Sequence, residues 1–467
     1  MAVTGAAFER RLDARLVLSV AAAGIMSFSG VVVETSMNIA FPALMEEFGV
    51  STATVQWITT GYLLVLAAII PLSAFLKRRF RTKTVFVAAA LLFLAGTVAC
   101  AAAPSFPVLL AGRVVQGVGT GLALPLMFNI VIEQAPLDRM GLMMGIATLI
   151  TAIAPAVGPS AGGLILSLAG WRMIFIVLVP LLVVSLVMGV AAIRQVAQPQ
   201  PARFSVPQFI ALAGGFACLI FAVNTATAAR WALLAGCVAL IALFCVLSNR
   251  SDNPLIRVSI FRDPAFALSV AYVVLLQSIA LATSYIIPNY AQLTWGYGEF
   301  AAGCLMLPGC IVGAVLAPFG GRILDALGAK RPIIIGAVSQ LFALVLFVTL
   351  GVRVAVVWLA IFNMFISIGQ GFSMSNSITN GLSFLPERLK ADGNAAFNTL
   401  QQLGGALGTA VATSIVNAAQ AGAADVAAAT TVGVGNAFAV LGVVSVTAFL
   451  CALGVFACRD RAKRRAH

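Results

Sequence analysis

The sequence contains few charged residues. Asp, Glu, Lys and Arg make up only 9% of its 467 residues, whereas a soluble globular protein carries about 25%. Hydrophobic residues make up 61%, and the mean hydropathy is +1.06. A surface with so little charge would aggregate in water, so the composition predicts an all-α integral membrane protein whose outer surface faces lipid.

Histidine is almost absent, since the only one is the last residue, His467. This excludes a histidine-based catalytic dyad and a histidine metal site. The eight cysteines show neither metal-ligand nor disulfide spacing, and seven of them lie inside apolar runs, where free cysteine behaves as a small hydrophobic residue. The apolar segments also lack paired acids and a phosphate-binding loop, which argues against a membrane-embedded enzyme. We therefore expect no metal.

Long apolar runs dominate the chain. A membrane-spanning helix needs about 20 apolar residues, and fourteen segments meet that requirement. Short connections leave no room for a soluble domain. The first run follows three arginines and could imitate a secretory signal, but the chain continues into further apolar segments, so we interpret it as a membrane helix. The predicted spans are 16–41, 54–76, 84–103, 106–132, 141–168, 172–193, 206–224, 230–248, 265–288, 299–320, 332–350, 355–380, 394–418 and 435–457.

The placement of Lys and Arg predicts the orientation of these helices, because cytoplasmic loops carry the excess of basic residues. If the N-terminus is cytoplasmic and the segments alternate, 24 of the 28 basic residues fall inside. Only Arg172, Arg230 and Arg353 fall outside, and Arg113 lies within a helix. The net charge of +13 therefore reflects topology and not nucleic-acid binding. We expect a multi-pass protein of the bacterial inner membrane with both termini cytoplasmic.

A weak internal repeat divides the chain. One basic loop follows the second predicted helix at Lys77, and another follows the tenth at Gly321. If the seventh and eighth helices are an insert, the plan is six plus two plus six. The expected domains are a six-helix bundle in 1–204, the insert in 205–249, and a second bundle with a basic tail in 250–467. Such repeats place the substrate site at their interface, near the membrane midplane.

Fourteen of the fifteen acids fall in loops, tails or helix ends, so Glu34 is the only acid in the interior of a predicted membrane helix. At 1.5 Å per residue it is roughly 18 Å from the outer end, and Asn38 lies on the same face. Charges in hydrocarbon are costly and usually functional, and burial disfavours the charged form of a carboxyl. Glu34 is therefore predicted to bind and release a proton; the alternative is a carboxylate permanently paired to a neighbour.

Arg113 is the other intramembrane charge, in the fourth predicted helix, with Gln116 following at helical spacing. A buried arginine without a partner would be very costly, so it needs one, or a water-filled cavity. A proton-coupling role and a purely structural clamp are both compatible with its position.

The fifth predicted helix contains the sequence APAVGPSAGG at residues 154–163. Pro155 and Pro159 break the backbone hydrogen-bond ladder, while Gly158, Gly162 and Gly163 allow another helix to approach closely. The segment is either a kinked packing seam or a bend that controls which side of the membrane the cavity faces, and neither role excludes the other.

These motifs resemble the major facilitator superfamily and, within it, the fourteen-helix drug:proton antiporter branch. GPSAGG, followed by WRMIF from Trp171, looks like the fifth-helix antiporter motif, which importers of the superfamily generally lack. NIAFP with QWITTGYLL resembles the first-helix signature, and FNTLQQLGGALGTA from Phe397 resembles the thirteenth-helix pattern. The residues that match the fourth-helix motif are Arg113, Gln116, Gly117, Gly119 and Gly121.

The resemblance implies a proton-driven exporter of lipophilic cations, dyes or antibiotics that works by alternating access without a cofactor. Protonation of Glu34 from outside would weaken substrate binding, and proton release inside would permit loading. We expect partners to be lipid, protons and small lipophilic substrates, with no nucleic acid; a monomer is expected, and a periplasmic adaptor stays open. The expected substrate cavity comprises Glu34, Asn38, Gln56, Tyr62, Gln116, Asn398 and Gln402.

The chain departs from the family pattern in three places. The family usually has an acid at the position of Val33, and Glu34 points about 100° away from it on a helix. The first-loop motif Gly-x-x-x-Asp-Arg reads Ser73, Lys77 and Arg78, so an acid-based gate is lost there. Gln401 stands where an arginine is frequent. The second loop keeps its motif at Gly321, Asp325, Gly328 and Arg331.

An exporter of one physiological metabolite, such as a peptide, bile acid or sugar, remains the main alternative, and a passive channel is a further one.

Overall fold

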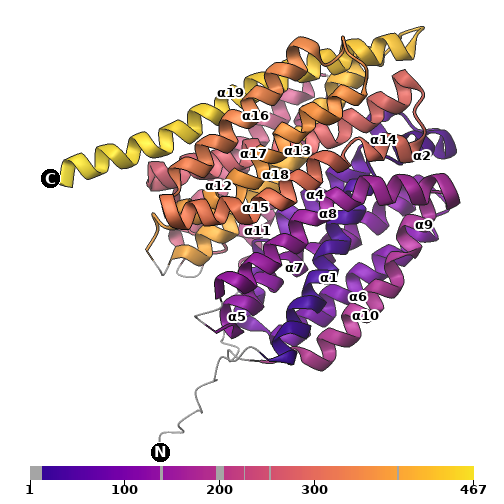
Figure 1. Cartoon of the computed structure of the whole chain (residues 1–467). Coiled ribbons are helices and arrows are strands. Elements are labelled where there is room, and N and C mark those ends of the chain that lie inside the picture. Colours follow the sequence, from indigo (N-terminus) through magenta and orange to yellow (C-terminus); the bar gives the residue numbers. More distant parts are fainter. Residues whose placement is uncertain are drawn as a thin grey trace, which may run out of the picture.

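The computed structural model describes residues 13–136, 140–195, 204–225, 227–251, 254–386 and 389–466. Within these ranges the regular structure is α-helical apart from one short 3₁₀ turn. Figure 1 shows long helices running side by side in two groups, the indigo-to-magenta N-terminal part and the orange-to-yellow C-terminal part.

The N-terminal half consists of long helices interrupted by short ones at the turns. α1 begins at Asp13, whose carboxylate caps the helix by accepting a hydrogen bond from the backbone N–H of Leu16 at 2.9 Å. Gly49 ends α2 in the left-handed conformation that glycine adopts without a steric penalty. The helices are α1 (Ala14–Ser36), α2 (Phe41–Phe48), α3 (Thr52–Val55), α4 (Trp57–Ile69), α5 (Leu72–Arg79), α6 (Thr82–Ala101), α7 (Phe106–Gln134), α8 (Met140–Ala169), α9 (Trp171–Ile176) and α10 (Leu178–Ala192).

The rest of the chain contains a helical pair and a second set of long helices. Asp263 caps the first of these long helices by accepting from the backbone N–H groups of Ala265 and Phe266 at 2.8 and 3.0 Å. The elements are α11 (Val206–Asn224), α12 (Ala229–Arg250), η2 (Val258–Arg262), α13 (Pro264–Trp295), α14 (Glu299–Cys304), α15 (Leu307–Leu327), α16 (Lys330–Leu350), α17 (Val357–Leu382), α18 (Lys390–Gln420) and α19 (Val426–Ala466).

The described residues contain twelve helical segments long and apolar enough to cross a membrane. They correspond to twelve of the fourteen predicted spans. The other two predicted spans, 141–168 and 394–418, lie in α8 and α18, which are helices of 30 and 31 residues. In α8, the side chains are described without interruption only over the apolar stretch Val157–Ala169. The fold is therefore an all-helical membrane bundle with twelve candidate spans.

The helical pair α11 and α12 lies beside the junction of the two halves. α11 packs on α4 of the first half and on α18 of the second, while α12 packs mainly on α11. Only 11% of the apolar stretch of α12 is buried, so this helix presents most of its surface to lipid. The pair thus covers one side of the junction without entering either half.

The two ends of the bundle differ. Figure 1 shows α2, α9 and α14 at one end, and α5 with the C-terminal end of α19 toward the other. We call these the α2–α14 end and the α5 end. Side-chain hydrogen bonds that join the two halves lie at the α2–α14 end.

Candidate functional site

Arg113 is held in the interior of the N-terminal half, with an exposed fraction of 0%. Its Nε donates to the carbonyl oxygen of Ile58 at 3.2 Å, and its Nη1 donates to Gln116 Oε1 at 2.9 Å. The guanidinium carbon lies 4.1 Å from the centroid of the Tyr62 ring, a cation–π contact. Nη2 has no hydrogen-bond partner among the described residues. Dipoles and an aromatic face therefore stabilise this cation, without a direct ion pair.

Hydrogen bonds extend from Arg113 to three neighbouring helices. Gln116 Nε2 donates to Thr97 Oγ1 on α6 at 2.8 Å. The Tyr62 hydroxyl, on α4, lies 2.8 Å from Thr120 Oγ1 on α7 and 3.1 Å from the carbonyl oxygen of Gly30 on α1. We call this set, Arg113, Gln116, Thr97, Tyr62, Thr120 and Gly30, the Arg113 network.

The fourth-helix glycines make this close packing possible. A Cβ on Gly119 would lie 2.7 Å from the carbonyl oxygen of Ala89 on α6. On the opposing helix, a Cβ on Gly96 would lie 2.6 Å from the backbone nitrogen of Gln116. Both distances are shorter than real contacts, so α6 and α7 approach each other backbone to backbone and bring Thr97 within reach of Gln116.

Glu34 lies on α1 one turn after Gly30 and is 3% exposed. Its carboxylate forms no hydrogen bond or ion pair in the part of the chain that the structure describes, but it lies close enough to Arg113 for the two charges to interact through space. No described residue therefore provides the permanent partner that the alternative interpretation of Glu34 requires. A buried carboxyl without a fixed partner is free to change its protonation state.

The other predicted cavity residues are distributed over several places. Tyr62 and Gln116 belong to the Arg113 network and are fully enclosed. Gln56 is buried and donates to Asn224 of α11. Asn398 and Gln402 are half-buried on α18, and no hydrogen bond among the described residues joins them to the Arg113 network.

Asn38 lies at a contact between the two halves. Its side-chain oxygen accepts from Thr59 Oγ1 at 2.9 Å, and its backbone carbonyl accepts from Asn289 Nδ2 of α13 at 3.0 Å. Thr52 Oγ1 donates to Gln420 Oε1 of α18 at 3.2 Å in the same region. These bonds tie the halves together at the α2–α14 end. Sequence reasoning missed Asn289 because it stands in no recognisable motif.

The fifth-helix motif has two packing faces. Ser36 Oγ of α1 donates to the Gly158 carbonyl at 2.7 Å, and a Cβ on Gly162 would lie 2.6 Å from the Cβ of Ser36. On another side, a Cβ on Gly163 would lie 2.5 Å from the carbonyl oxygen of Glu299, at the start of α14. The motif therefore touches both the end of α1 that carries Glu34 and the other half of the molecule.

The prolines do not divide α8 into two helices. α8 is continuous from Met140 to Ala169 through both Pro155 and Pro159, so the expected break is local. A membrane helix tolerates proline where neighbours compensate for the lost donor. The Pro159 carbonyl is in contact with Gly303 of α14, which places this proline at the junction of the halves.

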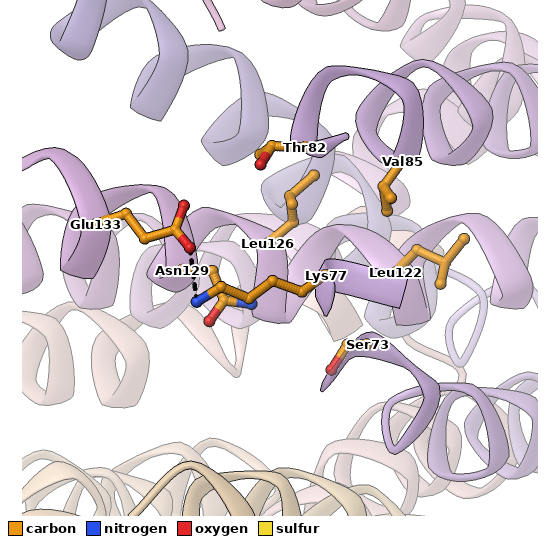
Figure 2. A pocket seen from close by; sticks show the side chains of 8 residues that line it. All are labelled: Ser73, Lys77, Thr82, Val85, Leu122, Leu126, Asn129 and Glu133. Atoms are coloured by element: carbon orange, nitrogen blue, oxygen red, sulfur yellow. Dashed lines mark ion pairs between the residues drawn. The ribbon is translucent and has the colours of Figure 1, made fainter. Parts of the chain in front are cut away.

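A cleft at the α5 end contains an ion pair that the sequence did not predict. Lys77 Nζ on α5 lies 2.9 Å from Glu133 Oε1 on α7. Figure 2 shows the pair beside Ser73 and Asn129, with Thr82, Val85, Leu122 and Leu126 also lining the cleft. Lys77 occupies the position of the family's acid, so the charge at this position is inverted and an acid on α7 supplies the partner.

The second-loop motif forms the turn between α15 and α16. Gly328 has a φ of 81° and ends α15, a conformation that favours glycine. Arg331 is exposed at the beginning of α16, and nothing lies within 4 Å of a Cβ built on Gly321. The side chain of Asp325 lies outside the described residues. The described part of the motif thus supplies the end of α15 and the turn into α16.

A model of the Major Facilitator Superfamily matches residues 20–409. This chain belongs to the major facilitator superfamily. It is thus a multi-pass membrane transporter in contact with the lipid bilayer, and not an enzyme.

Named relatives and solved structures agree with this assignment. The chain is 34% identical over 442 residues to "Lincomycin resistance protein LmrB" of Listeria monocytogenes, covering 91% of this chain and 94% of the relative. It is 29% identical over 416 residues to a "Multidrug resistance protein B homolog" of Mycobacterium tuberculosis, covering 86% and 77%. A crystal structure of a D-xylose–proton symporter has the same fold, with a TM-score of 0.68, 14% identity, and coverage of 94% and 96%.

Proposed function

We propose that this transporter exports small lipophilic drugs across the cytoplasmic membrane in exchange for protons, with Glu34 as the proton-binding group. The chain is a drug-efflux transporter of the superfamily, as relatives at about 34% identity are named for drug resistance. The names of the relatives do not mention protons, so the proposed proton exchange is argued from the residues of this chain.

The observation that carries the proposal is a buried carboxyl that has no hydrogen-bond or ion-pair partner among the described residues and lies near a buried arginine. Burial favours the neutral form of Glu34, while the positive charge of Arg113 favours the ionised form. With the two influences opposed, the protonation of Glu34 responds to the proton gradient. A carboxylate in a fixed ion pair would stay charged and could not do this.

Alternating access would follow from the asymmetry of the bundle. The halves are tied together at the α2–α14 end by Asn289 to Asn38 and by Thr52 to Gln420. We infer that this end faces outward, since the opposite end carries the basic loops. The described state would then be sealed on the outside and would load substrate from the cytoplasm.

The fourteen-helix arrangement belongs to the same proposal. α8 packs on α1 and on α14, and α18 packs on α4 and α13. Their lengths of 30 and 31 residues correspond to about 45 Å at 1.5 Å per residue, which exceeds the hydrocarbon thickness of about 30 Å. We therefore place both across the membrane, which gives two six-helix bundles and the α11–α12 insert.

The substrate class follows from the charge available. Glu34 is the only acid in the interior of a predicted span, so a divalent cation would keep one uncompensated charge in a low-dielectric cavity. We expect neutral or monovalent cationic drugs to be exported better than divalent ones. Lincomycin, the drug that appears in the names of the Listeria relatives, is the first substrate to test.

Inverted membrane vesicles offer a direct test. A monovalent dye such as ethidium should accumulate in the vesicles when the lumen is acidic and leave when an ionophore removes the pH gradient. A bis-quaternary dye of similar size should accumulate less. Dye movement that is indifferent to the gradient would indicate a passive channel, and transport restricted to one metabolite in a panel of unrelated compounds would indicate a dedicated exporter.

A further inference from the structure

Tyr62 touches Arg113 and the helix that carries Glu34, the two parts of the proposed proton site. It lies on α4 with an exposed fraction of 0%, and its ring faces the Arg113 guanidinium at 4.1 Å. At the other end of the side chain, the hydroxyl lies 3.1 Å from the carbonyl oxygen of Gly30 on α1. The ring thus holds the arginine, while the hydroxyl holds the helix that carries Glu34.

The Gly30 carbonyl belongs to the turn that positions Glu34. In an α-helix the carbonyl of residue i accepts from the N–H of residue i+4, so Gly30 and Glu34 are joined by one backbone hydrogen bond. Gly30 also permits a close approach of α7, because a Cβ there would lie 2.8 Å from Thr120 Oγ1. A rigid aromatic side chain therefore bridges from this turn of α1 to Arg113.

The hydroxyl groups of Tyr62 and Thr120 have two protons between them but make three close polar contacts. Tyr62 lies within hydrogen-bond distance of Gly30 O and Thr120 Oγ1, and Thr120 Oγ1 lies 3.2 Å from the Gln116 carbonyl. Each hydroxyl has one proton, and the carbonyls only accept. At most two of these three contacts are hydrogen-bonded at once. When Tyr62 donates to Thr120, its bond to Gly30 is released; when Tyr62 donates to Gly30, α1 is tied to α4.

We propose that Tyr62 is a positioning residue that sets the separation between Glu34 and Arg113, and that its choice of hydrogen-bond acceptor links the position of α1 to the protonation of Glu34. The proposal rests on the proposed proton-coupled function. It replaces the expected cavity-lining role of Tyr62, because its side chain is enclosed by α1, α4 and α7 and is not available to a substrate.

The other ionisable groups around this site are few. Among the described residues, Arg113 on α7 and Cys100 on α6 face it, in addition to Glu34 and Tyr62. The facing parts of α8, α10 and α18 contain no ionisable side chain, and Cys218 of α11 lies toward Gly236 of α12. A change in the pH dependence of transport on altering Tyr62 therefore reports on the Glu34–Arg113 pair.

Removing the Tyr62 hydroxyl should shift the pH dependence of efflux in a predictable direction. In Tyr62→Phe the ring still holds Arg113, but the turn before Glu34 loses its tie to α4 and can shift toward the guanidinium. A closer cation favours the ionised carboxylate, so a higher proton concentration is needed to load the site. The midpoint of pH-dependent efflux should move to lower pH by roughly half to one unit, which corresponds to one buried hydrogen bond worth about three- to tenfold.

Tyr272→Phe is a matched control in the other half. The Tyr272 hydroxyl is also buried and donates to Ser373 Oγ at 2.9 Å, far in sequence from the proton site. Its loss costs one comparable hydrogen bond without touching Glu34 or Arg113. Thr120→Val supplies a second variant: it leaves Gly30 as the acceptor of Tyr62, so α1 stays tied and the midpoint should not move to lower pH.

The experiment measures gradient-driven ethidium efflux against pH in proteoliposomes for wild type, Tyr62→Phe, Thr120→Val, Tyr272→Phe and Glu34→Gln. A shift to lower pH in Tyr62→Phe alone supports the proposal. It is overturned if Tyr62→Phe keeps the midpoint of Tyr272→Phe, or if Thr120→Val shifts in the same direction. Should Tyr62→Phe fail to fold, Thr120→Val decides alone: with Gly30 as the sole acceptor α1 stays tied, so a midpoint shifted to higher pH supports the proposal and an unchanged or lower one overturns it. Full pH-dependent efflux by Glu34→Gln would instead refute the proposed function itself.

Discussion

Single residues determine the electrostatics of the site. Arg113 is stabilised by the Ile58 carbonyl, by Gln116 and by the Tyr62 ring, and not by a direct bond to Glu34. The guanidinium therefore acts on the carboxyl at a distance, which leaves the carboxyl free to bind a proton. Arg113 can therefore hold neighbouring helices together and also act on the charge of Glu34. The structural role and the proposed coupling role of Arg113 are compatible in this geometry.

The first residue-level prediction concerns the coupling of these two charges. Glu34→Gln should reduce gradient-driven efflux to the passive background, because an amide cannot exchange a proton, while downhill exchange survives. Arg113→Ala should also stall exchange, since the carboxyl without a nearby cation favours its protonated form. It should also destabilise the fold, at roughly 1–3 kcal/mol for each buried acceptor left without a donor.

The double variant separates a shared site from two separate roles. If both residues act in one site, Glu34→Gln with Arg113→Ala should transport no worse than the poorer single variant. Efflux rates measured at equal protein density provide the comparison. Losses that multiply would show that Arg113 has a function independent of Glu34.

Glu47 offers a residue-level test outside the apolar spans. Its Oε2 accepts from Trp171 Nε1 at 2.6 Å, and its Oε1 lies 2.7 Å from Arg172 Nη1. The Trp171 hydrogen bond, with a smaller contribution from Arg172, lowers the pKa of Glu47 below its ordinary value of 4.5. Stability from this carboxylate is therefore present above about pH 4.5 and is lost as the pH falls through the lowered pKa.

The expected result is a lower thermal midpoint for Glu47→Gln at pH 7, with a difference from wild type that shrinks as the pH falls below 4.5 and through the lowered pKa of Glu47. The effect should be roughly 0.5 kcal/mol or less, because the side chain is 39% exposed and exposed pairs contribute little. Glu46→Gln, at an exposed neighbouring position, is the control. A difference that persists undiminished in acid would show that packing, and not the charge, is responsible.

Helix packing links the proton site to the junction of the halves. The Gly158 carbonyl accepts from Ser36 on α1, while Gly163 faces the backbone of α14. One helix, α8, therefore contacts both the end of α1 beyond Glu34 and the seal at the α2–α14 end. A shift of α1 on protonation has a direct mechanical route to that seal.

Two glycine substitutions in α8 should consequently fail in different ways. Gly158→Leu would collide with Thr35 of α1 and should abolish the pH dependence of efflux. Gly163→Ala would push α8 away from Glu299 and should weaken the seal, which raises the passive dye leak several-fold. Gly236→Ala on α12, where the nearest atom to a new Cβ is 3.6 Å away, is the control. Behaviour of all three like wild type would remove the gating role of α8.

The sequence predicted where the helices lie along the chain better than which side chains of different helices contact each other. Glu34 and Arg113 stood out because an ionisable residue at membrane depth is rare, and the glycines of α7 and α8 because close approach requires them. Gln56 was expected in the cavity, but its bond to Asn224 depends on where the α11–α12 insert lies, which no local pattern encodes. The Lys77–Glu133 pair joins residues 56 positions apart along the chain, so its geometry emerges only from the packed bundle.

The whole molecule was predictable to the level of an all-helical membrane transporter. Apolar length alone located twelve spans that the structure contains. It is less decisive for α18, because the amides and small residues of this helix lower its hydropathy. These are also residues of the proposed transport pathway, so function weakens the apolar signal by which this helix would be recognised.

Topology is the prediction that belongs to this scale. With fourteen crossings and a cytoplasmic N-terminus, both termini lie inside, so a C-terminal fluorescent protein should fluoresce and a C-terminal alkaline phosphatase should be inactive. The same pair of reporters fused in the loop after Arg353 should give the reverse result. An active C-terminal phosphatase would mean that one of the proposed crossings, in α8 or α18, is absent.

The central claim is the exchange of protons for drug, and proton movement itself tests it most directly. Purified transporter is reconstituted into liposomes that enclose a pH-sensitive dye, a monovalent drug is added outside, and the luminal pH is followed for wild type and Glu34→Gln. We predict that drug entry into the lumen drives protons out of it, so the luminal pH rises with wild type and stays constant with Glu34→Gln. Drug uptake by wild type with no change in luminal pH, or an equal rise with Glu34→Gln, would contradict the account.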